Sequence, residues 1–307
     1  MIVVLVLVVI GVIAGLSAAA AIRHWPQADP ASAATHALGE ELGRSRQARS
    51  FLRSRLDPGT ATGLALTVSM IGAVVAGGVI GILILMIRAN TGFVVVDHSA
   101  ARWAGSNTGA TATRVLEAIT LLGSTPVIVA VAVAGAVYGI ARWRSPSIPL
   151  FFLVVVLGQF LTSNAIKFAV DRARPDLHPL VGFSGPSFPS GHSTAAAATY
   201  AALALVMARG RSPRVRAALA GIAVGIAVAV ACSRVFLGVH WASDVVAGLL
   251  LGWAWFGLCS VAFGGRFLRF GAPAKEAAAG PAFGAVPPRE GRQEAVRSLG
   301  RGGATER

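Results

Sequence analysis

The chain has 307 residues, of which 55% are hydrophobic and only 13% are charged, and its formal net charge is +14. A mean hydropathy of +0.69 excludes an ordinary soluble domain, and apolar runs of 18 or more residues predict membrane-spanning helices. Because the Arg residues cluster in loops, we attribute the positive charge to membrane topology and anionic lipid, and we predict no nucleic-acid partner. Cys232 and Cys259 lie within apolar runs and predict neither a disulfide framework nor a metal site.

Seven apolar segments predict an all-α fold, an integral membrane helical bundle in which a six-helix core follows one additional N-terminal transmembrane helix. The first segment, residues 2–22, has no basic region before it and is followed by Arg23, which favours an anchor with its N-terminus outside over a cleaved signal peptide. The fifth segment is short and rich in alanine, so we expect it to pack inside the bundle. The six segments of the core are 63–87, 115–141, 148–170, 193–208, 215–237 and 243–263.

These segments divide the chain into four regions. Residues 1–22 form the N-terminal anchor, 23–62 a cytoplasmic basic linker, 63–263 the six-helix membrane domain, and 264–307 a basic cytoplasmic tail whose composition predicts disorder. Within the linker we expect an amphipathic helix near 37–56. In the outer loop, Val94 to Trp103 is predicted to lie as a helix along the membrane surface.

Basic residues gather in alternate loops, all on one side of the predicted bundle. They occur in 23–62, at Arg142 and Arg144, in 209–216, and after 264. The positive-inside rule places this side in the cytoplasm and predicts a multi-pass protein of the cell membrane. Three polar clusters then lie at the opposite, extracytoplasmic ends of the apolar segments, where ionisable groups are costly and therefore indicate function.

The first cluster is Lys167 with Arg174-Pro175, and a third cation, Arg234, belongs to the third cluster. Lys167 and Arg174 are seven residues apart, which places both on one helical face, and Arg234 ends the sixth segment on the same side. A single cation at such a place usually extends its charge to the membrane interface. Three converging cations with few acids nearby instead indicate an oxyanion ligand, and the planar fork of Arg suits phosphate. We expect Arg172 to pair locally with Asp171 and leave both outside this site.

The second cluster, Pro189-Ser190-Gly191-His192, is a turn that leads into the alanine-rich fifth segment. Free backbone N–H groups at a helix N-terminus form an anion site, Gly191 lets the backbone approach closely, and Ser190 offers a hydroxyl donor. A simple N-cap role for Ser190 or Ser193 is the structural alternative, and it is compatible with phosphate contact. His192, at a helix start that faces three cations, is placed to donate a proton to a departing alkoxide.

The third cluster contains His240 and Asp244, which are neighbours if a helix begins near Val239. A carboxylate beside an imidazole sets its tautomer and leaves the other ring nitrogen free to attack phosphorus. Alone, such a pair is more often structural. The presence of His192 and three cations beside this pair favours a catalytic role.

A metal site built from His192, His240, Asp244 and His178 is the competing interpretation. The cations Lys167, Arg174 and Arg234 would repel a divalent ion, and no second carboxylate is placed to offset them. We therefore predict phosphoryl transfer with no metal and no other cofactor, in which fixed cations stabilise the transferred charge.

In order and spacing, the three clusters resemble the signature of the type 2 phosphatidic acid phosphatase (PAP2) superfamily, in its membrane lipid phosphatase branch. The resemblance covers Lys167 to Asp244, and the apolar pattern from 63 to 263 is similar to the family's six-helix core. No signature position departs from the pattern. The matching residues are Lys167 with Arg174-Pro175, then Pro189-Ser190-Gly191-His192, then Ser233-Arg234 with His240 and Asp244.

The resemblance implies roles that agree with the interpretation of the residues themselves. His240 is the expected nucleophile of a phosphohistidine intermediate, Asp244 orients it, and His192 is the general acid that later assists the attacking water. The family's hydrolases need no metal. Five residues are expected to bind the phosphoryl oxygens: Lys167, Arg174, Ser190, Gly191 and Arg234.

We expect a membrane phosphatase that acts on a lipid phosphate or diphosphate at the outer face, because short loops leave the site close to the bilayer. Undecaprenyl diphosphate is the first choice of substrate, followed by phosphatidic acid and phosphatidylglycerol phosphate. The alternatives are a phosphotransferase with a hydroxyl acceptor and a non-catalytic protein that binds or transports a lipid phosphate. The predicted partners are this lipid and the bilayer, and no oligomeric state is predicted.

Overall fold

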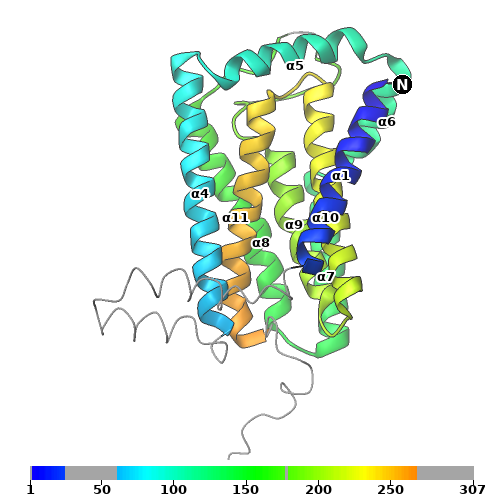
Figure 1. Cartoon of the computed structure of the whole chain (residues 1–307), viewed down its shortest axis with the longest axis vertical. Helices are drawn as coiled ribbons and strands as arrows, with labels where there is room; N and C mark the ends of the chain where they lie inside the picture. Colours follow the sequence, from blue (N-terminus) through cyan, green and yellow to red (C-terminus); the bar gives the residue numbers. More distant parts are fainter. Residues whose placement is uncertain (1, 25–60, 177–178, 268–307) are drawn as a thin grey trace, which may run out of the picture. The chain divides into compact units, whose positions relative to one another are not determined.

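The computed structural model describes residues 2–24, 61–176 and 179–267, all within one compact unit. Every regular element in this part of the chain is an α-helix, as predicted (Figure 1). The expected helix at 37–56 and the expected disorder after 267 lie outside the described residues. In chain order the helices are α1 (Ile2–His24), α4 (Ala61–Ala89), α5 (Phe93–Asn107), α6 (Ala110–Leu121), α7 (Thr125–Trp143), α8 (Ser147–Val170), α9 (Gly191–Ala208), α10 (Pro213–Phe236) and α11 (Ala242–Phe267).

Six of the described helices are long and apolar enough to cross a membrane, namely α1, α4, α7, α8, α10 and α11. Large apolar side chains are exposed along them: Val74 is 72% and Phe168 is 83% exposed. Water would disfavour such surfaces, whereas lipid hydrocarbon solvates them. The described part is therefore a multi-pass membrane bundle with an additional N-terminal helix, as the sequence predicts.

Helix α9 lies inside the bundle, where it contacts α7, α8, α10 and α11. Its small side chains let the neighbours approach, and Ala196, Ala198 and Ala202 are fully buried. On the facing helix α11, a Cβ on Gly248 would lie 2.6 Å from the Ser190 carbonyl oxygen, so this position requires glycine. The expectation that 193–208 packs inside the bundle is confirmed, and the close approach fixes the start of α9 against the start of α11.

One candidate span lies in the segment predicted at 115–141, but the predicted start is wrong, because the chain forms two helices there, α6 and α7, and only α7 is long and apolar enough to cross a membrane. Ser124 occupies the N-cap position of α7 and Pro126 stands in its first turn, where a missing N–H costs nothing. The turn also brings Gly123 against α9. A Cβ on Gly123 would lie 3.0 Å from the His192 carbonyl oxygen, so glycine at the turn permits this contact.

Helix α1 packs on α10 through glycines that face each other. A Cβ on Gly15 would lie 2.7 Å from the Gly221 carbonyl oxygen, and Gly11 similarly meets Gly225. Two glycines four residues apart on each helix give a groove that lets backbones pack closely in a membrane. This packing holds α1 against the bundle, and α1 runs antiparallel to α10.

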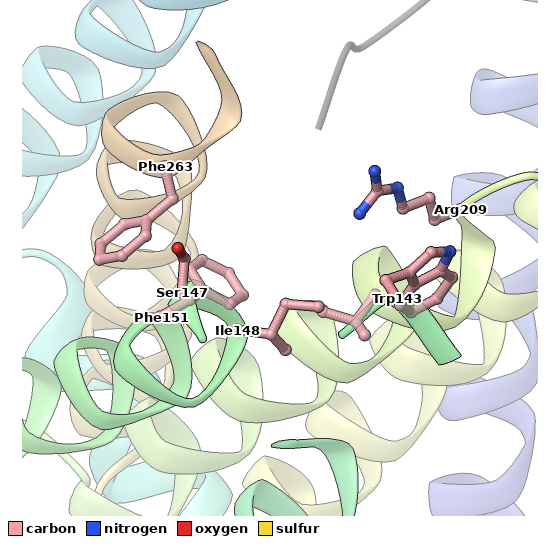
Figure 2. A pocket seen from close by; sticks show the side chains of 7 residues that line it. Trp143, Ser147, Ile148, Phe151, Arg209 and Phe263 are labelled. Atoms are coloured by element: carbon pink, nitrogen blue, oxygen red, sulfur yellow. The ribbon is translucent and has the colours of Figure 1, made fainter. Parts of the chain in front are cut away.

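The described residues of the polar clusters lie at one end of the helices, and Arg142, Arg144 and the arginines of 209–216 lie at the opposite end. Helix α5 lies across the end that carries the clusters, and it contacts α4, α10 and α11 (Figure 1). At the opposite ends of α7, α8, α9 and α11, Ile148 and Phe263 are among the residues that line a small apolar cavity (Figure 2). There the Arg209 guanidinium stacks over the Trp143 ring, with its carbon 5.2 Å from the ring centroid. The described cluster residues are thus separated from this Arg-bearing end by the length of the bundle.

Candidate active site

His240 and Asp244 lie where the turn after α10 enters α11. His240 is 3% exposed and Asp244 is fully buried, and the His240 Nδ1 atom is 3.3 Å from Asp244 Oδ2. Asp244 Oδ2 also accepts a hydrogen bond from the Trp241 N–H at 2.9 Å, at the N-terminus of α11. The carboxylate therefore holds the Nδ1 proton of the imidazole and leaves a lone pair on Nε2.

Arg172 holds the other oxygen of Asp244. Its Nη1 donates to Asp244 Oδ1 at 2.7 Å, and its Nη2 pairs with Asp97 of α5 at 2.8 Å. The expected local pair with Asp171 is therefore wrong, and Arg172 belongs to the site. Its partners are 72 and 75 residues away in sequence, so residue spacing offered no signal for the contacts.

Arg174 reaches over His240 from the segment that follows α8. Its Nη1 donates to the Val239 carbonyl oxygen at 2.8 Å and lies 3.2 Å from His240 Nε2. Its other N–H groups donate to carbonyl oxygens of the turn before α9, those of Ser184, Gly185 and Pro186. The guanidinium is therefore held beside the nitrogen that carries the lone pair, and its partners are neutral.

Lys167 and Arg234 also hydrogen-bond to neutral groups. Lys167 Nζ donates to the Pro186 carbonyl oxygen at 2.6 Å, and Arg234 Nη1 donates to Thr120 Oγ1 at 3.0 Å. Arg234 is 7% exposed, and its buried Nε has no hydrogen-bond partner among the described residues. These contacts orient the cations but leave their charges uncompensated, as an anion site requires.

The start of α9 supplies the remaining predicted residues. Ser190 is the N-cap, fully buried, and its Oγ accepts hydrogen bonds from the N–H and the hydroxyl of Ser193, at 3.5 and 3.0 Å. The Ser190 N–H donates to the Asp244 carbonyl oxygen at 2.9 Å, which ties this turn to α11. Gly191 has open space where a Cβ would project, and its φ is not positive. Packing and backbone conformation therefore do not require glycine at 191.

Both histidines lie outside the six apolar spans and carry no charge at neutral pH. Burial lowers the pKa of His240 to about 4; Asp244 opposes this shift, and Arg174 and Arg234 reinforce it. Burial and then nearby positive charges, with Arg234 first among them, lower the pKa of His192 to about 3. A neutral His240 is competent as a nucleophile.

No three His, Cys, Asp or Glu side chains of the described residues are grouped to hold a metal ion. His192, His240 and Asp244 lie near one another at this end of the bundle, while His178 lies outside the described residues. The candidate site is thus a neutral imidazole between three cations and a helix N-terminus. This arrangement fits an oxyanion that is attacked at its centre.

Comparisons with known proteins show the family of the chain. A family model described as the PAP2 superfamily matches residues 148–267, which contain every candidate residue. Phosphatidylglycerophosphatase B of Bacillus subtilis is 35% identical over 144 residues, which are 45% of this chain and 68% of that protein. The chain belongs to the PAP2 superfamily. The predicted family is therefore confirmed.

Two further comparisons define how far the similarity extends. Lipid A 1-phosphatase of Rhizobium johnstonii is 43% identical over 119 residues, which are 36% of this chain but only 44% of that relative. The crystal structure of a transmembrane PAP2-type phosphatidylglycerolphosphate phosphatase from Bacillus subtilis matches with a TM-score of 0.56 and 28% identity. The match covers 64% of this chain and 98% of that one, and it confirms the helical membrane fold.

Gly191→Ala tests whether the start of α9 binds phosphate. Because a Cβ there meets no atom within 4 Å, we expect the free energy of unfolding to change by less than about 1 kcal/mol. The methyl group would stand where an oxyanion approaches the backbone N–H groups, so inorganic phosphate should raise the unfolding temperature of the variant less than that of the wild type.

Gly77→Ala on α4 is the matched control, since a Cβ there also meets open space. It should respond to phosphate as the wild type does. An equal response of Gly191→Ala, measured by thermal unfolding over a phosphate titration, would contradict the assignment.

Proposed function

We propose that the protein hydrolyses the phosphate or diphosphate ester of a membrane lipid through a phosphohistidine formed on His240. The position of His240 supports this proposal most directly, because its Nδ1 faces Asp244 and its Nε2 lies 3.2 Å from the Arg174 guanidinium. A phosphoryl group bound to Arg174 would bring its phosphorus to the Nε2 lone pair. The names of the PAP2 relatives, which are phosphatases, agree with this chemistry.

The reaction proceeds in two displacements at phosphorus. In the first, the His240 Nε2–P bond forms, the bond between phosphorus and the leaving oxygen breaks, and His192 gives that oxygen a proton. In the second, water attacks phosphorus and gives a proton to His192, the N–P bond breaks, and phosphate leaves. Asp244 holds the Nδ1 proton throughout, which stabilises the positive charge on the phosphorylated imidazole.

The uncompensated cations serve the transferred phosphoryl group. Lys167, Arg174 and Arg234 are oriented by neutral oxygens, so their charges are available to the phosphoryl oxygens as negative charge redistributes. The unpartnered Nε of Arg234 is a donor that such an oxygen satisfies. A bound phosphate also opposes the low pKa of His192, since its negative charge stabilises the imidazolium that acts as the acid.

A lipid substrate follows from where the site lies. Helix α5 lies across this end of the bundle and exposes Val95 and Trp103, which suit the interfacial region of a membrane. A substrate whose tail stays in the bilayer would present its phosphate at this level. Undecaprenyl diphosphate stays the first candidate, beside phosphatidic acid and phosphatidylglycerol phosphate, and the names of the relatives add lipid A.

The charge of the described loops supports an extracytoplasmic site. Arg142 lies in the last turn of α7, Arg144 follows that helix, and four arginines lie between 209 and 216, all at the end of the helices opposite the candidate site. The positive-inside rule assigns that end to the cytoplasm. The phosphoryl transfer then occurs at the outer face of the membrane.

Phosphate release from a panel of these lipids by the purified full chain in detergent tests the proposal. The wild type should release phosphate from at least one of them without added metal, and His240→Ala should reduce kcat by at least about 1,000-fold, because the nucleophile is lost. Equal rates for the two proteins would contradict the mechanism. Transfer to an added alcohol without phosphate release would favour the phosphotransferase, and binding without turnover would favour the non-catalytic alternative.

Thiol labelling tests the orientation, in a Cys232→Ser/Cys259→Ser background. Leu180 is 38% exposed near the candidate site, and Arg211 is exposed at the opposite end. In intact cells an impermeant thiol reagent should label Leu180→Cys and spare Arg211→Cys, which should react only after lysis. The reverse pattern would place the site in the cytoplasm.

A further inference from the structure

Asp97 is a buried carboxylate that the mechanism above does not use. It lies near the start of α5 and is fully buried, although His98 and Ser99 beside it are exposed. Its Oδ1 accepts the Ser243 N–H at 2.8 Å, and its Oδ2 accepts the Ser243 hydroxyl at 2.6 Å. A carboxylate from a distant helix thus caps the N-terminus of α11, one residue before Asp244.

Arg172 joins this carboxylate to the catalytic one. Its Nη2 pairs with Asp97 at 2.8 Å, while its Nη1 donates to Asp244 Oδ1 and to Ser243 Oγ, each at 2.7 Å. The guanidinium also stacks on Trp241, with its carbon 5.2 Å from the ring centroid. One planar fork therefore spans two carboxylates, a geometry that the single ammonium of lysine does not reproduce.

The consequence for His240 is geometric. Asp244 has two oxygens, and Arg172 engages Oδ1, so Oδ2 is the one that meets His240 Nδ1. Rotation of the carboxylate would break the Arg172 contact, which fixes the plane of the hydrogen bond to the imidazole. Buried ion pairs add little net stability compared with apolar packing, so a role in positioning accounts better for this costly arrangement.

We propose that Asp97 and Arg172 are positioning residues, which hold the Asp244 carboxylate in the orientation that aims His240 Nε2 at phosphorus. This inference rests on the proposed function. It also makes α5, the helix across the candidate site, part of the catalytic alignment. The chain of contacts runs from Asp97 through Arg172 to Asp244 and then to His240.

Steady-state kinetics of Arg172→Lys, Arg172→Gln and Asp97→Asn in the full chain tests the proposal. Per folded enzyme, each should lose about 10- to 100-fold in kcat, while KM changes less than about threefold, because alignment and not phosphate binding is lost. Arg172→Lys keeps the charge but cannot serve both carboxylates. Arg102→Lys, which alters an exposed arginine of α5, is the matched control and should match the wild type.

The pH dependence of kcat/KM distinguishes a positioning role from general structural damage. Its acid limb is the fall in kcat/KM as the pH decreases and His240 becomes protonated. Arg172→Gln removes a positive charge beside Asp244. The Asp244 carboxylate then stabilises the His240 imidazolium more strongly, so the acid limb of kcat/KM should move to higher pH. Asp97→Asn leaves the Arg172 charge facing Asp244 alone, so the limb should move to lower pH. Arg172→Lys should leave the limb nearly in place. The other titratable and charged groups around His240 stay in every variant: Asp244 on α11, Lys167 on α8, Arg174 after α8, Arg234 on α10, His192 on α9 and His98 on α5.

Several results would overturn the proposal. Variants with wild-type kcat per folded enzyme, or with acid limbs that both move in one direction, would show that the network does not act on His240. If neither Arg172→Lys nor Asp97→Asn folds, the network is a requirement for folding instead. If the wild type releases no phosphate, the proposed function fails, whereas an active wild type with an inactive His240→Ala and unaffected network variants rejects this inference alone.

Discussion

The candidate site depends on the buried carboxylate of Asp244. A charge without exposure to water is costly unless hydrogen bonds and an opposite charge compensate for it. Asp244 obtains both, from Arg172 at Oδ1 and from the Trp241 N–H and His240 at Oδ2, while its carbonyl oxygen accepts the Ser190 N–H. One residue therefore joins the start of α11, the turn before α9, the segment after α8 and the proposed nucleophile.

The cations divide into two kinds by their partners. Arg172 pairs with two carboxylates within the protein, whereas Lys167, Arg174 and Arg234 donate to carbonyl or hydroxyl oxygens that carry no charge. An apolar bundle amplifies the field of such uncompensated charges. Burial, reinforced by this field, lowers the pKa of His240 and His192 and keeps both neutral, which suits a nucleophile directly and suits a general acid only after an anion has bound.

Much of this arrangement follows from local signals in the sequence. Helical periodicity and hydropathy predicted the spans, and each polar motif lies at a helix end that Pro, Gly or a capping residue marks, as with Ser190 before α9. The break between α6 and α7 was missed because hydropathy runs through it, although Gly123, Ser124 and Pro126 together signal a helix end and a new start. The partners of Arg172 had no local signal. Its pair with Asp97 depends on how α5 lies across α11, which only tertiary packing determines.

The proposed mechanism requires His240 to carry the phosphoryl group during turnover. Rapid quenching of the wild-type enzyme with a radiolabelled lipid phosphate that it turns over, followed by peptide mapping, measures this directly. We expect a label that is stable in base and labile in acid, located on His240, and formed and lost at rates compatible with kcat. Full turnover without any covalent label, or a label on another residue, would contradict it.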